Sequence, residues 1–158
     1  MTPPPRPPSL TTVRSTAFAV AALLLLVAVG TVLDEPLLIP PLAASAALVH
    51  GAPGLPLAQP RSVIGGQLLS ALTGFAVLTA VGSSPWAAAL AGGLALGAMT
   101  AARTPHSPAA ATAVIVVLQS PAAARFLPLL ALATALLVAV GILAGRAGRT
   151  AVRYPQYW

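Results

Sequence analysis

The chain has 158 residues, of which 58% are hydrophobic and 6% charged, and its mean hydropathy is +0.92. This composition excludes a soluble domain and indicates an integral membrane protein, because apolar segments occupy nearly all positions from 15 to 145. The net charge of +6 comes from arginines that stand singly at the edges of apolar runs, a pattern that excludes a nucleic-acid-binding patch; with no cysteine, disulfides and thiolate metal sites are excluded too.

The N-terminal segment 1–14, MTPPPRPPSLTTVR, is rich in proline and is expected to form a disordered cytoplasmic tail. The apolar run after it is interpreted as an uncleaved first span rather than a signal peptide, because the remaining chain is itself multispanning. The predicted organisation is this tail, one transmembrane domain at 15–147, and a basic and aromatic tail at 148–158.

Four segments are long enough to cross about 30 Å of hydrocarbon as helices, at about 1.5 Å per residue: 15–33, 62–82, 85–102 and 126–145. Two further apolar runs, PLLIPPLAASAALV and PAAATAVIVVL, begin at Pro36 and Pro108. Their helical parts reach only about 15 to 20 Å. The predicted fold is therefore an all-α polytopic membrane bundle of four long transmembrane helices and two short helices.

The two short helices share a pattern. Pro41 and Pro108 are each placed as the first residue of a helix, where proline is favoured because its missing N–H is not needed. Each proline is followed by small residues, a hydroxyl four places on, and then aliphatic residues, so that Ser45 aligns with Thr112. The order long, short, long thus occurs twice, as a weak sequence repeat.

The number of crossings depends on whether the short pieces cross the membrane or re-enter. Re-entrant pieces give four crossings, whereas six crossings place seven arginines on one side and only Arg125 on the other, with Asp34 and Glu35. The positive-inside rule favours six, with a multi-pass chain in the cell membrane and both termini cytoplasmic. Six crossings in two groups of three predict a 3+3 inverted repeat, with both short-helix N-termini pointing at the middle of the bilayer.

Small residues at four-residue spacing predict close helix packing on three of the long spans. The alternative is a compositional bias toward alanine and glycine. The residues expected to pack against other helices are Gly66, Ser70, Gly74, Gly93, Gly97, Gly141 and Gly145.

The starts of the short helices form the candidate binding site. A helix N-terminus carries unpaired N–H groups and roughly half a positive charge, so two such ends inside the bilayer favour an anion. Irregular backbone at that depth requires a protein-lined or watery cavity, whereas a loop histidine at the interface is the alternative interpretation of His106. The predicted site residues are Pro41, Ser45, His106, Ser107, Pro108 and Thr112.

The stretches PPLAASAALVHGAPGLPLAQPRSVIGGQLLSALTG from Pro40, PHSPAAATAVIVVL from Pro105 and the terminal RYPQYW from Arg153 resemble the HPP family of integral membrane proteins. The family's His-Pro-Pro motif corresponds to positions 106–108, with serine in place of the central proline, and Ala43 and Ala110 stand where the family favours glycine. The resemblance implies a bundle usually described with four transmembrane segments, and some plastid and cyanobacterial relatives are linked to nitrite transport.

The leading functional hypothesis is a channel or transporter for a small monovalent anion such as nitrite, with the bilayer and the anion as partners. The rival hypothesis is a non-transporting interaction subunit that acts through its small-residue faces, and self-association fits either one. The sequence contains no phosphate-binding loop, nucleophile elbow, carboxylate pair or metal-ligand cluster, so we expect neither catalysis nor a cofactor.

Overall fold

The computed structural model describes residues 6–147 and 153–158, and all regular elements in these ranges are helical. Three short elements precede or join the longer ones: the 3-10 helix Pro56–Ala58, the π-helical turn Arg61–Gly65 before α3, and the 3-10 turn Ser107–Ala109 before α5. The α-helices are α1 Ser9–Leu33, α2 Pro40–Gly51, α3 Gly66–Val81, α4 Pro85–Ala101, α5 Ala110–Gln119 and α6 Ala123–Arg146.

Within the described part of the chain, three helical segments are long and apolar enough to cross a membrane: Ser9–Leu33, Arg61–Val81 and Ala123–Arg146. The predicted span at 85–102 corresponds to α4, an apolar helix of 17 residues that is shorter than these three segments. Its start is fixed by the Ser84 side chain, which accepts the N–H of Ala87, and it ends before Arg103, which adopts a positive φ of 56°.

The boundary of the N-terminal tail is corrected. Helix α1 begins at Ser9, so positions 9–14, which were expected to be disordered, form its first turns. The first five residues of this tail, and positions 148–152 of the expected C-terminal tail, lie outside the described residues.

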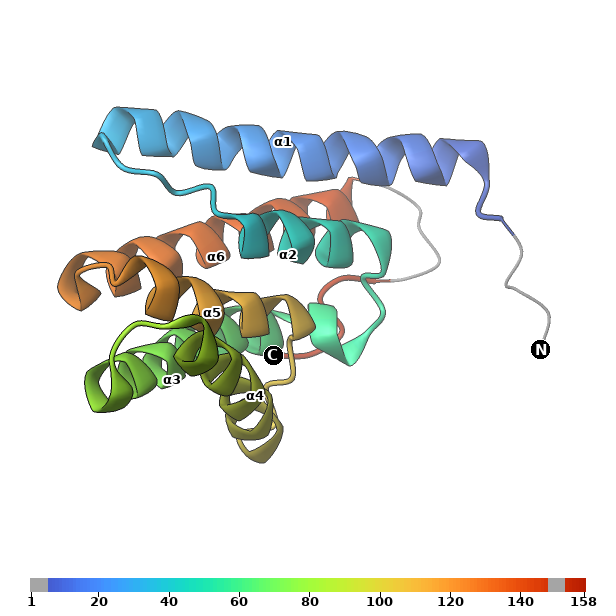
Figure 1. The fold of residues 1–158 in the computed structure, drawn as a ribbon. Coiled ribbons are helices and arrows are strands. Elements are labelled where there is room, and N and C mark those ends of the chain that lie inside the picture. The colour runs from blue at the N-terminus through green and yellow to red at the C-terminus, as the bar shows by residue number, and fades with distance from the viewer. Residues whose placement is uncertain (1–5, 148–152) are drawn as a thin grey trace.

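Helices α1 and α6 are antiparallel neighbours. The Arg14 guanidinium near the start of α1 donates to the Ala144 carbonyl near the end of α6, at 2.6 Å. At the opposite end, Glu35 forms an ion pair with Arg125 in the first turn of α6. Figure 1 shows that successive helices run back and forth across the bundle, so the start of α1 and the end of α6 lie at the same end.

The two ends of the bundle differ in charge. One end, called here the arginine-rich end, carries Arg14 and Arg146 together with Arg61, whose guanidinium donates to the carbonyl of Ala102 next to Arg103. The other, called the carboxylate end, carries Asp34, Glu35 and Arg125.

The helices pack in two groups of three. Helices α1, α2 and α6 contact one another, and α3, α4 and α5 form a second mutually contacting group. Figure 1 shows the first group along one side of the molecule and the second along the other. The groups meet where α3 packs on α6 and where α2 packs on the turn before α5.

Corresponding contacts recur in both groups. A Cβ added to Gly74 of α3 would lie 3.0 Å from the Cβ of Val116 in α5, and one added to Gly141 of α6 would lie 2.7 Å from Cγ1 of Val49 in α2. Positions 74 and 141 are 67 apart in sequence, as are 49 and 116. The same offset relates Pro41 to Pro108 and Ser45 to Thr112, so the weak sequence pattern has a counterpart in the packing.

Candidate functional site

Four buried polar side chains meet where the two helix groups touch. Ser45 lies in α2, Gln67 in the first turn of α3, Thr112 in the first turn of α5, and His106 in the segment before α5. Each is at most 1% exposed. We call these four residues the polar centre. Because unpaired polar groups are costly in apolar surroundings, such a cluster must satisfy its own hydrogen bonds.

His106 is held from both sides of its ring. Its Nδ1 lies 2.7 Å from the carbonyl oxygen of Leu57, and its Nε2 lies 2.7 Å from Oγ of Ser45. The close approach to α3 requires glycine at position 66, where a Cβ would lie 2.7 Å from the His106 Cβ and 2.9 Å from the Thr104 carbonyl oxygen. The packing role predicted for Gly66 therefore also serves to position the histidine.

Gln67 joins the two hydroxyl groups of the polar centre. Its Nε2 donates to Oγ of Ser45 at 3.0 Å, and its Oε1 accepts the hydroxyl of Thr112. The two hydroxyls aligned by the sequence pattern thus bind opposite sides of one amide group. Sequence reasoning missed Gln67, although a single glutamine inside an apolar span is a signal for a functional residue.

The depth of the polar centre follows from the position of Gln67 in its span. Gln67 is the seventh residue of the apolar segment Arg61–Val81, so it lies about 9 Å along the helix axis from Arg61 at the arginine-rich end. His106 and Thr112 are bonded to the same cluster and share this depth. The polar centre therefore lies below the helix ends, among membrane-spanning segments.

The remaining predicted site residues lie at the edge of the polar centre or outside it. Pro41 is buried, and its carbonyl oxygen lies 2.9 Å from Oγ of Ser45. Pro108 is partly buried within the turn Ser107–Ala109. Ser107 is exposed and is itself the first residue of this turn, so its side chain lies outside the cluster.

The backbone donors at the two helix starts are engaged within the chain. The Leu42 N–H donates to the Ile39 carbonyl, and the Ala109 N–H donates to the His106 carbonyl, both at 2.9 Å. Pro40 and Pro41 have no N–H to offer. The side chains of the polar centre, more than free backbone amides, are therefore the donors concentrated at this junction.

The small-residue faces predicted for packing differ in whether another part of the chain covers them. In α3, Gly74 packs on α5, and the Ser70 hydroxyl donates to the Ala109 carbonyl. In α6, a Cβ on Gly141 or Gly145 would lie 2.8 Å or less from atoms of Tyr154. In α4, the chain places no atom within 4 Å of a Cβ built on Gly93 or Gly97, among the residues described, so its face is exposed.

The C-terminal segment 153–158 closes the arginine-rich end. Tyr154 is 4% exposed and packs with Val49, Val63 and Val138, and burial raises the pKa of its phenol. The backbone N–H of Gln156 donates to Oε1 of Gln59 at 2.8 Å, while Nε2 of Gln59 donates to carbonyls in the loop before the 3-10 helix Pro56–Ala58. That loop continues to Leu57, the backbone partner of His106.

These features define a multi-pass helical membrane protein with a buried polar centre. The model of the family "HPP, transmembrane region" matches residues 4–155. The chain therefore belongs to the HPP family of membrane proteins, as the sequence motifs predicted.

Two similar curated proteins, both described as transmembrane proteins, come from Dictyostelium discoideum. One is 40% identical over 82 residues, covering 49% of this chain and 26% of the relative. The other is 34% identical over 125 residues, covering 73% of this chain and 43% of the relative. The chain thus spans less than half the length of either relative. No solved structure matches the chain.

Proposed function

We propose that this HPP-family protein is a channel or transporter for a small monovalent anion such as nitrite, and that the polar centre is its binding site. One observation carries the proposal: four polar side chains from separate elements meet, fully buried, between the two helix groups of an apolar membrane bundle. Polar residues at membrane depth are costly and typically mark pathways for ions or substrates.

The chemistry of the polar centre favours an anion over a cation. Two hydroxyls and an amide N–H can donate hydrogen bonds to it, and the imidazole adds a donor at Nε2 when its ring carries a second proton. The two acidic side chains of the chain, Asp34 and Glu35, follow α1 at the carboxylate end. In the proposal, the bound anion accepts hydrogen bonds from the hydroxyls of Ser45 and Thr112, which now bond to His106 and Gln67 respectively.

The recurrence of contacts at a 67-residue offset supports the 3+3 inverted repeat as part of this proposal. In it, α1–α3 form one repeat and α4–α6 the other, and the third helix of each repeat packs into the group of the other repeat. Inverted repeats with a site at their interface are common among transporters. The arginine-rich end is placed in the cytoplasm of a cell-membrane protein by the positive-inside rule, and no catalytic step is involved.

The test is nitrite uptake into proteoliposomes. We expect His106→Ala, Gln67→Leu and Thr112→Val each to reduce the initial rate at least about tenfold, the factor that corresponds to about 1.4 kcal/mol of lost stabilisation. Thr100→Val is the matched control, because Thr100 is exposed on α4 and bonds only the carbonyl of Leu96 in its own helix. Equal uptake by all variants and by protein-free vesicles would exclude the site.

A second candidate function is that of an interaction subunit, and the exposed face of α4 favours it. Ala89, Gly93 and Gly97 lie four apart and are exposed, a spacing that lets a second helix approach closely. Energy transfer between labelled copies in liposomes tests this role. Gly97→Leu should abolish transfer, whereas Gly51→Leu, at another glycine with open space around it, should leave transfer intact; unchanged transfer in both would reject this interface.

A further inference from the structure

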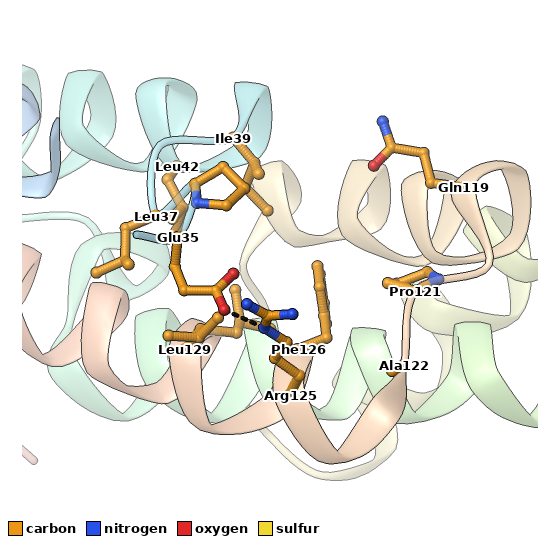
Figure 2. A pocket seen from close by; sticks show the side chains of 12 residues that line it. Glu35, Leu37, Ile39, Leu42, Gln119, Pro121, Ala122, Arg125, Phe126 and Leu129 are labelled. Atoms are coloured by element: carbon orange, nitrogen blue, oxygen red, sulfur yellow. Dashed lines mark hydrogen bonds and ion pairs between the residues drawn. The ribbon is translucent and has the colours of Figure 1, made fainter. Parts of the chain in front are cut away.

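A cavity of about 170 Å³ opens at the carboxylate end between α2, α5 and α6. The Glu35–Arg125 ion pair lies at its rim, and Figure 2 shows these two side chains pointing toward each other across the space. Its walls include Ile39, Phe126 and Leu129, while the buried Leu42 and Leu130 line its inner part. The volume is large enough for several water molecules.

The cavity leads toward the polar centre. Leu42 and Ser45 are three positions apart in α2, which places them on the same face of the helix about one turn from each other. Leu42 is only 1% exposed and Ser45 is fully buried. One layer of apolar side chains therefore separates the bottom of the cavity from the hydroxyl of Ser45.

The 67-residue offset assigns a counterpart to this cavity at the arginine-rich end. It relates Ile39 to His106 and Leu129 to Ser62. Ile39 and Leu129 are partly exposed in the cavity, whereas His106 and Ser62 are buried, at 1% and 3% exposure.

The counterpart space is filled by the chain itself. The loop from Pro53 to Gln59 enters it, bonded to His106 through the Leu57 carbonyl and held by the side chain of Gln59. The backbone of Gln156 binds this glutamine from outside. The two spaces related by the 67-residue offset therefore differ. The cavity at the carboxylate end is open, and its counterpart at the arginine-rich end is filled by the loop.

We infer that the cavity beside Glu35 and Arg125 is the aqueous vestibule through which the anion enters the polar centre, with Leu42 and Leu130 as its inner barrier. The loop from Pro53 to Gln59 is the closed barrier of the related vestibule at the other end. The inference rests on the proposed transport function and adds the route and the side of access. Arg125 has an exposed guanidinium, whose charge offsets that of Glu35 at the mouth.

Cysteine accessibility tests this route, because the chain has no native cysteine. In proteoliposomes of known orientation, Leu129→Cys should react with a water-soluble anionic methanethiosulfonate added at the carboxylate end. Without nitrite, Ser62→Cys should react only slowly with reagent added at the arginine-rich end, and during nitrite uptake it should react at least about threefold faster. Leu24→Cys, exposed on the apolar surface of α1, is the control for reaction from the lipid phase and should stay unreactive.

Charge at the mouth gives an independent readout. Arg125→Gln leaves Glu35 without its counter-charge, so it should lower the ratio of anionic to cationic reagent reactivity at Leu129→Cys at least about threefold. An unreactive Leu129→Cys, or a Ser62→Cys that reacts equally fast without nitrite, would overturn the inference.

Uptake measured in the same vesicles separates the two proposals. Modification of Leu129→Cys should block nitrite uptake; uptake that persists after complete modification would overturn the route and leave the transport function standing. Absent uptake in the unmodified wild-type protein would instead reject the transport function, whatever the accessibility of the cysteines.

Discussion

Helices α3 and α4 carry the same spacing of small residues but use it differently. In α3, Gly66, Ser70 and Gly74 lie against other parts of the chain, with backbone atoms as close as 2.8 Å to a Cβ built at position 74. In α4, Gly93 and Gly97 have open space where a Cβ would stand. The spacing therefore permits close approach, and the partner available in the fold decides whether the approach is made.

The largest effect is expected for Gly74→Leu. The new side chain would collide with the Ala113 carbonyl and the Val116 side chain of α5, neither of which is the flexible end of a long side chain. We expect the free energy of unfolding to fall by about 3 kcal/mol or more, measured by denaturant unfolding in micelles. Gly93→Leu in α4 is the matched control and should be at least as stable as wild type; equal losses in both variants would contradict the comparison.

Gly66→Ala should have a smaller and more local effect. Its Cβ would press on the Cβ of His106 and on the Thr104 carbonyl, forcing the segment before α5 outward. We expect a loss of about 1 to 3 kcal/mol, together with reduced nitrite uptake in a variant that still folds. If uptake stays at the wild-type rate while stability falls, the close approach at Gly66 serves packing alone.

Ser70→Ala should lower the free energy of unfolding by less than Gly66→Ala does. The Ser70 hydroxyl donates to the Ala109 carbonyl at the start of α5, and its loss leaves that buried oxygen without this donor. A decrease of about 1 kcal/mol in the free energy of unfolding is expected. Thr73→Val in the same helix is the control, since Thr73 is bonded to the Leu69 carbonyl of its own helix; a greater loss at Thr73 than at Ser70 would argue against the contact with α5.

The smallest effect is expected for Gly93→Ala, and it has the opposite sign. The added methyl group meets no atom of the chain, and alanine favours a helix more than glycine does. We expect a gain of about 0.5 to 1 kcal/mol in the free energy of unfolding. A marked loss of stability in dilute micelles would show that the α4 face is already in contact within the molecule.

The same pair of helices shows what the sequence could and could not predict. Periodicity identified the small-residue faces of α3, α4 and α6, but an identical spacing carries no information on which face finds a neighbour within the chain. The bounds of α4 were predicted to within one residue, because Ser84 and Pro85 mark its start and Arg103 follows its end.

The candidate site was predicted in part, for a physical reason. Ser45, His106 and Thr112 were expected together because the proline-start pattern repeats, and they do meet. Gln67 was missed because it precedes no proline and follows two glycines, so only its polarity within an apolar span marked it. Ser107 was included because it adjoins the histidine in sequence, but at a helix start neighbouring side chains point in different directions.

The Ser45 hydroxyl has one hydrogen and two acceptor atoms within reach, Nε2 of His106 at 2.7 Å and the Pro41 carbonyl oxygen at 2.9 Å. When the His106 ring is neutral and donates from Nδ1 to Leu57, its Nε2 can only accept, and the hydroxyl hydrogen must point to the ring. A second proton on the ring makes Nε2 a donor and turns that hydrogen toward Pro41. The orientation of this one hydroxyl therefore records whether the histidine carries a charge, and it changes without any displacement of the backbone.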